Sequence, residues 1–179
     1  MKVGVVAGTT RSCVPRLRPH LDGVELIAHA GMVGGAAVLD ELAQIAPVHA
    51  VVGHRDFLEL GDRLPETDVV DLPGGRIVIT HLIGEPPDFL PPVLRRLQEG
   101  QAPDVLVHGH PPTSSAIWVG GTLVFSPGHA RGGPRGRTGS VGLLDLEPGQ
   151  PITAHVYELE AEDRAAAERP GAGRSADRT

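Results

Sequence analysis

Residues 105–118 of the chain read VLVHGHPPTSSAIW. The apolar run at their start predicts a strand buried on both faces, and a His-Gly-His follows directly after it. In α/β proteins, ligands bind at the carboxyl ends of parallel strands, and histidines placed there commonly hold a metal. The two prolines that come next offer no ligand atom. The stretch therefore predicts a metal site that is either complete or partly lost.

The composition sets the class of protein. The chain has 179 residues, of which 40% are hydrophobic but only 3% aromatic, so the core must be built from aliphatic side chains. A net charge of −6 gives no basis for binding nucleic acid or an anionic membrane. A single cysteine and the lack of a signal peptide or long apolar run predict a cytoplasmic protein. We expect one domain over residues 1–159 and a disordered tail over residues 160–179.

Short apolar runs alternate with helical patterns along the first two thirds of the chain. Continuous aliphatic runs bounded by turn residues predict buried strands at residues 3–6, 24–28, 48–52, 77–79 and 105–107. Apolar spacings of three and four predict helices at residues 34–47 and 88–100, whereas the proline-rich residues 10–23 predict only a short, broken helix. The alternation indicates an α/β fold.

The last third has a different pattern. Gly120 and Gly121 separate two apolar runs and predict a tight hairpin. Residues 140–159 predict two more strands around a Pro-Gly turn. We therefore expect a second, more antiparallel sheet packed on the first.

Each early strand is followed by a conspicuous tripeptide or tetrapeptide. These are GTT at residues 8–10, AGMV at 30–33, GHRD at 53–56, THLI at 80–83 and GHPP at 109–112, and the hairpin ends in SPGH at 126–129. In order and spacing the set resembles the calcineurin-like metallophosphoesterases, in particular the branch of small bacterial phosphodiesterases and the retromer subunit. That family reads Asp-x-His, Gly-Asp, Gly-Asn-x-Asp, Thr-His-Gly, Gly-His-x-His and Asn-Pro-Gly-Ser at these points. The resemblance covers residues 1–159 and implies a β-sandwich flanked by helices, in αββα layers.

The departures from the family pattern fall on one of its two metal ions. The resemblance places the ligands of the first metal, including the bridging aspartate, at Gly8, Thr10, Met32 and Pro112. Glycine, methionine and proline cannot supply the anionic oxygen that such a site needs, and a threonine hydroxyl binds cations weakly. The first metal is therefore expected to be lost.

The second metal site is rebuilt. The resemblance places its ligands at His81 and His110, which are kept, and at His54, which stands where the family has an asparagine. Three imidazoles with an open fourth position suit one divalent metal, Zn²⁺ or else manganese, iron or nickel. The alternative is a metal-free relic in which the histidines only organise their loops.

Other polar residues near the strand ends are candidates for the rest of a site. Arg55 and Asp56 come directly after His54, and His129 lies at the end of the hairpin. Arg55, Asp56 and His129 are therefore candidate catalytic residues. Thr10, His29 and the basic loop residues Arg131 and Arg135 are candidates for substrate binding. For each arginine, a solvated surface position is the alternative.

Three functions remain open from the sequence. The first is a single-metal hydrolase acting on a small anionic substrate. The second is a non-catalytic module that binds a protein or a ligand, a role known in this family and favoured if the shortened first helix exposes an apolar patch. The third, disfavoured by the lost ligands, is a conventional two-metal phosphodiesterase. The sequence gives no oligomeric state.

Overall fold

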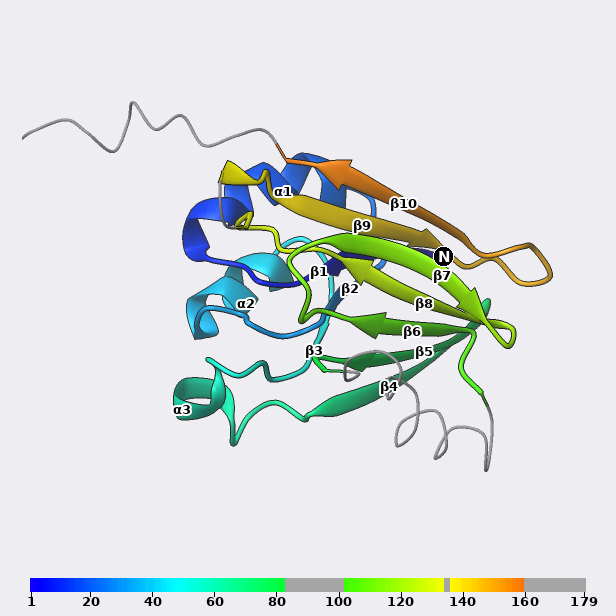
Figure 1. Cartoon of the computed structure of the whole chain (residues 1–179), viewed down its shortest axis with the longest axis horizontal. Coiled ribbons are helices and arrows are strands. Elements are labelled where there is room, and N and C mark those ends of the chain that lie inside the picture. Colours follow the sequence, from blue (N-terminus) through cyan, green and yellow to red (C-terminus); the bar gives the residue numbers. More distant parts are fainter. Residues whose placement is uncertain (83–101, 134–135, 160–179) are drawn as a thin grey trace, which may run out of the picture.

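The computed structural model describes residues 1–82, 102–133 and 136–159, which form two five-stranded sheets packed face to face (Figure 1). The first sheet has the order β10-β9-β1-β2-β3 and the second β4-β5-β6-β8-β7. Three short α-helices and one 3₁₀ turn flank them, on the side toward which β6 and β8 point. The predicted α/β sandwich is thus confirmed.

The elements follow one another in this order, with η marking the 3₁₀ turn: β1 (Lys2–Val6), η1 (Arg11–Cys13), α1 (Val14–Leu21), β2 (Leu26–His29), α2 (Ala36–Ala43), β3 (Val48–Ala50), α3 (Phe57–Leu60), β4 (Thr67–Leu72), β5 (Gly75–Thr80), β6 (Val105–His108), β7 (Ser114–Val119), β8 (Thr122–Pro127), β9 (Ser140–Asp145) and β10 (Thr153–Glu158). Every strand predicted from the sequence is present. The predicted helix at residues 88–100 and the predicted tail at residues 160–179 lie outside the described residues.

The division of strands between the sheets differs from the prediction. The last four strands do not form a sheet of their own: β8 pairs in parallel with β6, whereas β9 pairs antiparallel with β1. A turn motif in the sequence shows that the two strands beside it pair with each other. It does not show which sheet the resulting hairpin joins. Strand β4 was missed because it lies at a sheet edge and only Val70 in it is buried, which leaves no continuous apolar run.

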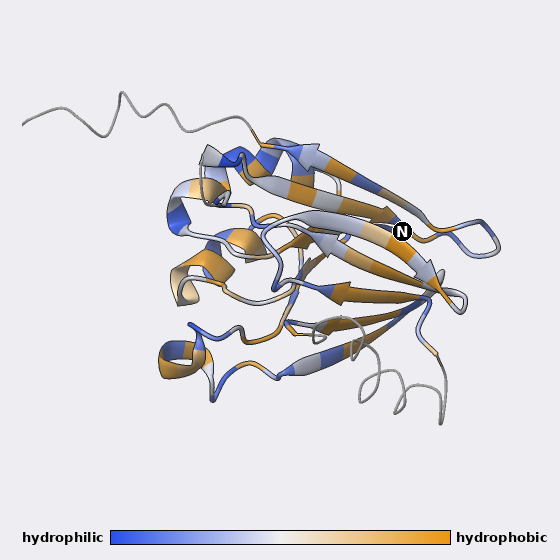
Figure 2. Ribbon diagram, in the orientation of Figure 1, coloured by the Kyte–Doolittle hydropathy of each residue, from blue (hydrophilic) through white to orange (hydrophobic). Residues whose placement is uncertain are grey.

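Two apolar layers hold the fold together (Figure 2). Val3 and Val5 face the second sheet and pack with residues such as Ile77 and Phe125. Val6 and Ile27 belong to a separate cluster on the other face of the first sheet, covered by α1 and α2. This alternation sets which face of the sheet each residue occupies, and the parallel pairing of β1 with β2 brings their carboxyl ends to one edge of the sandwich.

The first helix is more complete than its prolines predict. Pro15 lies in the first turn, where a missing amide hydrogen costs nothing, and Pro19 faces solvent inside the helix. Val14, Leu17 and Leu21 are fully buried against the first sheet. The expectation that a broken helix exposes an apolar patch here is therefore wrong. Among the described residues, no helix has the length and apolar character needed to cross a bilayer.

Candidate metal centre and adjoining pocket

The three histidines expected to bind a metal come together at the edge of the sandwich. His54 follows β3, His81 follows β5 and His110 lies two residues after β6. One ligand atom from each lies within 4.8 Å of the others. The rings of His54 and His110 are stacked, with centroids 4.7 Å apart, and His81 meets both edge-on. Each side chain comes from a different loop, so the cluster depends on the packed sheet.

His81 is held in one tautomer by the backbone. Its Nδ1 lies 2.8 Å from the carbonyl oxygen of Ala30, which can only accept, so Nδ1 carries the proton. Its Nε2 is then an unprotonated, buried atom that has no hydrogen-bond partner among the residues that the structure describes. Burial lowers the pKa of His81 and so favours the neutral ring, although the hydrogen bond to Ala30 acts in the opposite direction. A buried lone pair aimed into a histidine cluster is the state that a metal ligand requires.

The residues present fit a divalent ion of the zinc type. Nitrogen atoms that bind one tetrahedral zinc ion lie about 3.4 Å from one another. The ligand atoms of the three histidines lie within 4.8 Å of one another, so a small movement would bring them to that distance. His54 and His110 are exposed, so their rings are free to turn toward the fixed Nε2 of His81. The Ala30 carbonyl also supplies the outer hydrogen bond that metal-binding histidines usually make.

Another side chain fills the space beside Gly8, where the family pattern has a metal-binding aspartate. Gly8 has φ +57°, and a Cβ atom there would lie 2.5 Å from Cγ of His129. The His129 ring therefore occupies the space that a side chain at position 8 would need. Met32, where the family pattern has the bridging aspartate, also has a positive φ of 56°.

His129 supports the loop that carries His110. Its Nε2 lies 3.1 Å from the Gly109 carbonyl oxygen and 3.2 Å from that of His110, so it donates to the backbone beside His110. Burial is the main cause that lowers its pKa, and the nearby Arg131 cation lowers it further. The ring, a candidate catalytic group from the sequence, is turned toward these carbonyls and away from solvent.

Asp56 joins the loops that follow β2 and β3. Only 3% exposed, it accepts hydrogen bonds from the amides of Gly53 at 2.7 Å, Val33 at 3.1 Å and Gly34 at 3.4 Å. The structure thus gives this candidate catalytic carboxylate a set of backbone partners. It holds the loop that carries His54 against the loop that carries Met32.

His29 lies beneath the site and has no exposed surface. The Thr9 hydroxyl donates to the Val33 carbonyl at 2.6 Å, so the 2.7 Å contact between Thr9 Oγ1 and His29 Nε2 is donated by the histidine. Desolvation lowers the pKa of His29 to about 4. A ligand in the site therefore meets this predicted substrate-binding residue only through Thr9.

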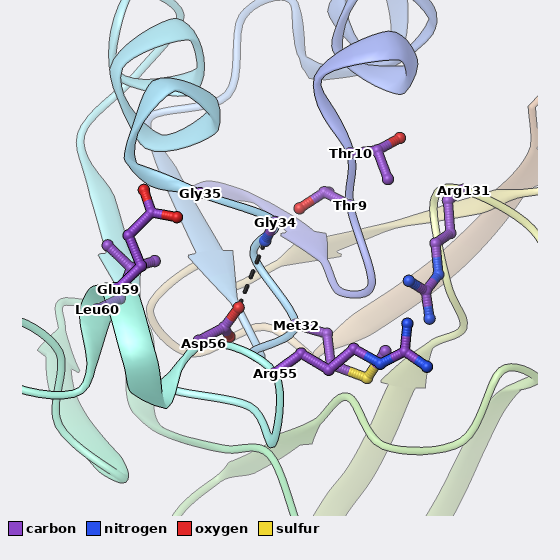
Figure 3. Close-up of a pocket in the computed structure, with 10 residues that line it drawn as sticks. All are labelled: Thr9, Thr10, Met32, Gly34, Gly35, Arg55, Asp56, Glu59, Leu60 and Arg131. Carbon is purple, nitrogen blue, oxygen red and sulfur yellow. Dashed lines mark hydrogen bonds between the residues drawn. The ribbon is translucent and has the colours of Figure 1, made fainter.

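A cavity of about 230 Å³ adjoins the histidine cluster (Figure 3). Its lining includes two of the first-metal positions together with charged side chains: Thr9, Thr10, Met32, Gly34, Gly35, Arg55, Asp56, Glu59, Leu60 and Arg131. The guanidinium groups of Arg55 and Arg131 point toward each other beside Met32, and Glu59 lies on the opposite wall.

Half of the lining residues were identified from the sequence: Thr10, Met32, Arg55, Asp56 and Arg131. Two others with polar side chains, Thr9 and Glu59, belong to no motif that would have marked them. Arg135, predicted to bind substrate, lies outside the described residues.

Comparison with known proteins agrees with this architecture. A family model described as the calcineurin-like phosphoesterase superfamily domain matches residues 1–149. A probable metallophosphoesterase from Methanocaldococcus jannaschii is 32% identical over 111 residues, which cover 61% of this chain and 55% of that protein. The chain thus spans only about half the length of this curated relative.

Two solved structures show the same fold. Vps29 from Chaetomium thermophilum has a TM-score of 0.72 at 21% identity, over 92% of this chain and 91% of that one. Wild-type Vps29 from Entamoeba histolytica, solved in complex with Zn²⁺, has a TM-score of 0.65 at 19% identity, over 88% of this chain and 99% of that one.

Proposed function

The chain belongs to the calcineurin-like phosphoesterase superfamily, and we propose that it is a divergent member working with one divalent metal, held by His54, His81 and His110. The observation that carries this proposal is the buried Nε2 of His81, which the Ala30 carbonyl fixes as a free lone pair on a ring that lies edge-on to His54 and His110. A buried nitrogen without a partner costs stability, and an ion bound in the cluster would remove that cost at His81.

The proposed activity is hydrolysis of a small anionic substrate. A divalent ion in the cluster would act as a Lewis acid and would lower the pKa of a water molecule toward neutral pH. The residues of the chain do the remaining work. Asp56 and His129 position the loops that carry His54 and His110, and Arg55 and Arg131 bind the negative group of the substrate.

A conventional two-metal phosphodiesterase is the weaker hypothesis. That mechanism uses paired ions to stabilise both the attacking and the leaving oxygen. Here a side chain at position 8 would collide with His129, and no anionic ligand stands at positions 8, 10 or 32. These observations favour the single-ion site.

A binding module is the second candidate, favoured by one feature of the surface. Trp118 and Ile117 lie on the edge strand β7 and are 57% and 58% exposed. Aromatic side chains exposed at a sheet edge are typical of protein contacts. A relative by fold, Vps29 from Chaetomium thermophilum, has been solved in complex with a cyclic peptide.

Metal content of untagged protein tests the proposal. We expect about one equivalent of zinc, manganese, iron or nickel in the wild type. His54→Ala and His110→Ala should each bind the metal at least tenfold more weakly and so contain much less of it. Both rings are exposed, so these variants should fold. His155→Ala, which removes an exposed histidine on β10, is the matched control and should keep the metal.

A second readout is thermal unfolding with and without added Zn²⁺. The ion should raise the Tm of the wild type and of the control, but not of the two triad variants. If no protein binds metal, even after reconstitution, the single-metal hypothesis is wrong and the exposed face of β7 becomes the place to look for function.

A further inference from the structure

The pocket beside the histidine cluster contains two cations that have no partner. Arg55 and Arg131 both line it, and within the described ranges neither makes a hydrogen bond or an ion pair. Figure 3 shows their guanidinium groups directed toward one another. Two like charges facing each other across a small cavity repel, and an anion between them removes that repulsion.

The carboxylates in the same lining do not take the place of that anion. Asp56 is buried and accepts from three backbone amides, so its lone pairs are already in use. Glu59 accepts from the Ala36 amide at 2.9 Å on the opposite wall, beside the start of α2. The positive charge is therefore concentrated on the wall next to His54 and Met32.

From this arrangement we propose that Arg55 and Arg131 form a metal-independent site for a phosphate group, beside the position that the family pattern gives to its first metal. Thr10 and Met32, two of the lost ligand positions, line the same cavity. Two guanidinium groups carry the same charge as one divalent cation. This inference extends the proposed function by naming the anionic group, but it does not require a bound metal.

The shape of the two side chains favours a tetrahedral dianion over a carboxylate. Each guanidinium is a planar fork that bonds two oxygens at once. A carboxylate has two oxygens and satisfies one fork, whereas a terminal phosphate has enough oxygens for both. The Thr10 hydroxyl, which is 3.1 Å from Ser12 Oγ, lies on the lining as a further polar contact for such a group.

Calorimetry on metal-free protein tests the site. Untagged protein treated with EDTA would be titrated with inorganic phosphate, with phenyl phosphate and with acetate, at low salt. We expect phosphate or phenyl phosphate to bind at least tenfold more tightly than acetate. Tighter binding of phenyl phosphate would identify the ligand as a phosphate ester, and tighter binding of inorganic phosphate would identify free phosphate.

Variants distinguish a specific site made by Arg55 and Arg131 from nonspecific attraction of anions by surface arginines. Arg55→Ala and Arg131→Ala should each weaken binding at least tenfold, and Arg131→Lys, which keeps the charge but not the fork, should lie between them and the wild type. Arg18→Ala removes an exposed arginine of α1, bonded to Gln44, and should leave binding unchanged.

The result that overturns the inference is the absence of binding to the metal-free wild type, or binding that survives both alanine substitutions. Zinc uptake by the same preparations, measured after the EDTA has been removed and Zn²⁺ added back, keeps the two proposals apart. Phosphate binding without any metal uptake would uphold the arginine site and reject the triad, and the reverse result would do the opposite.

Discussion

The two halves of the site, each at one of the family's metal positions, have changed in opposite ways. At the second position, three histidines from three loops converge, and the backbone sets one of them as a neutral ligand. At the first position, Gly8 and Met32 replace ligands, and the ring of His129 fills the space. The ring of His129 also supports the loop of His110 in the other half, so one side chain contributes to both.

The largest effect on this comparison should come from Asp56, because its carboxylate holds both halves. Replacing it with alanine leaves the buried amides of Gly53 and Val33 without acceptors. Hydrogen bonds to charged groups contribute about 1.5–3 kcal/mol each, so we expect Asp56→Ala to lower the free energy of unfolding by about 3 kcal/mol. Urea unfolding measures the loss.

Two further variants sharpen the result. Asp56→Asn keeps one acceptor oxygen and should be destabilised about half as much. Asp62→Ala removes an exposed acid nearby and should change stability by less than about 0.5 kcal/mol. If Asp56→Ala matches Asp62→Ala in stability, the carboxylate does not join the two halves.

A smaller effect is expected from rebuilding the lost ligand at position 8. Gly8→Asp places a Cβ atom against the His129 ring and a side chain on a backbone with φ +57°. Overpacking of this kind costs about 1–3 kcal/mol, so we expect a loss of about 2 kcal/mol in the free energy of unfolding.

The double variant Gly8→Asp/His129→Gly distinguishes a filled position from a merely strained one. In the His129→Gly background, Gly8→Asp should cost much less free energy of unfolding than it does in the wild type. The difference between the two costs, measured in a double-mutant cycle, should be at least about 1 kcal/mol. Additive effects would mean that His129 does not occupy the space of the first ligand, and the contrast between the halves would lose its physical basis.

The sequence was sufficient for the parts of the molecule that depend on local pattern. Aliphatic runs located the buried strands, and histidines at the ends of parallel strands had to lie near one another, so His54, His81 and His110 could be proposed together. The contact of Ala30 with His81 and the packing of His129 on Gly8 depend on segments far apart in the chain. Strand pairing across the sandwich decides them, and no local pattern encodes it.

The same limit explains two of the errors in the fold. Which sheet receives β8 and which receives β9 depends on the partner strand that each meets, β6 or β1. The helix α1 forms in spite of its prolines because Leu17 and Leu21 gain burial against the first sheet. Tertiary packing outweighed a local propensity in that case.

The last predicted effect concerns the floor shared by both halves, where His29 is buried against Thr9. Burial lowers the pKa of His29 from 6.5 to about 4, with Asp56 opposing and His81 reinforcing the shift. Between those two values the unfolded chain binds a proton that the folded chain does not. The free energy of unfolding should therefore fall as the pH drops from 6.5 toward 4, with a slope of at most about 1.4 kcal/mol per pH unit from this residue.

His29→Gln tests that contribution, because glutamine can still donate to Thr9 but does not titrate. Urea unfolding at several values between pH 7.5 and about pH 4.5 should give a shallower decline in the variant than in the wild type. Burial also lowers the pKa of His108 to about 4, so part of the decline should remain. His155→Gln, on the exposed face of β10, is the control. An unchanged slope in His29→Gln would mean that the ring is not buried in its neutral form, and the floor beneath the two halves would then be open to solvent.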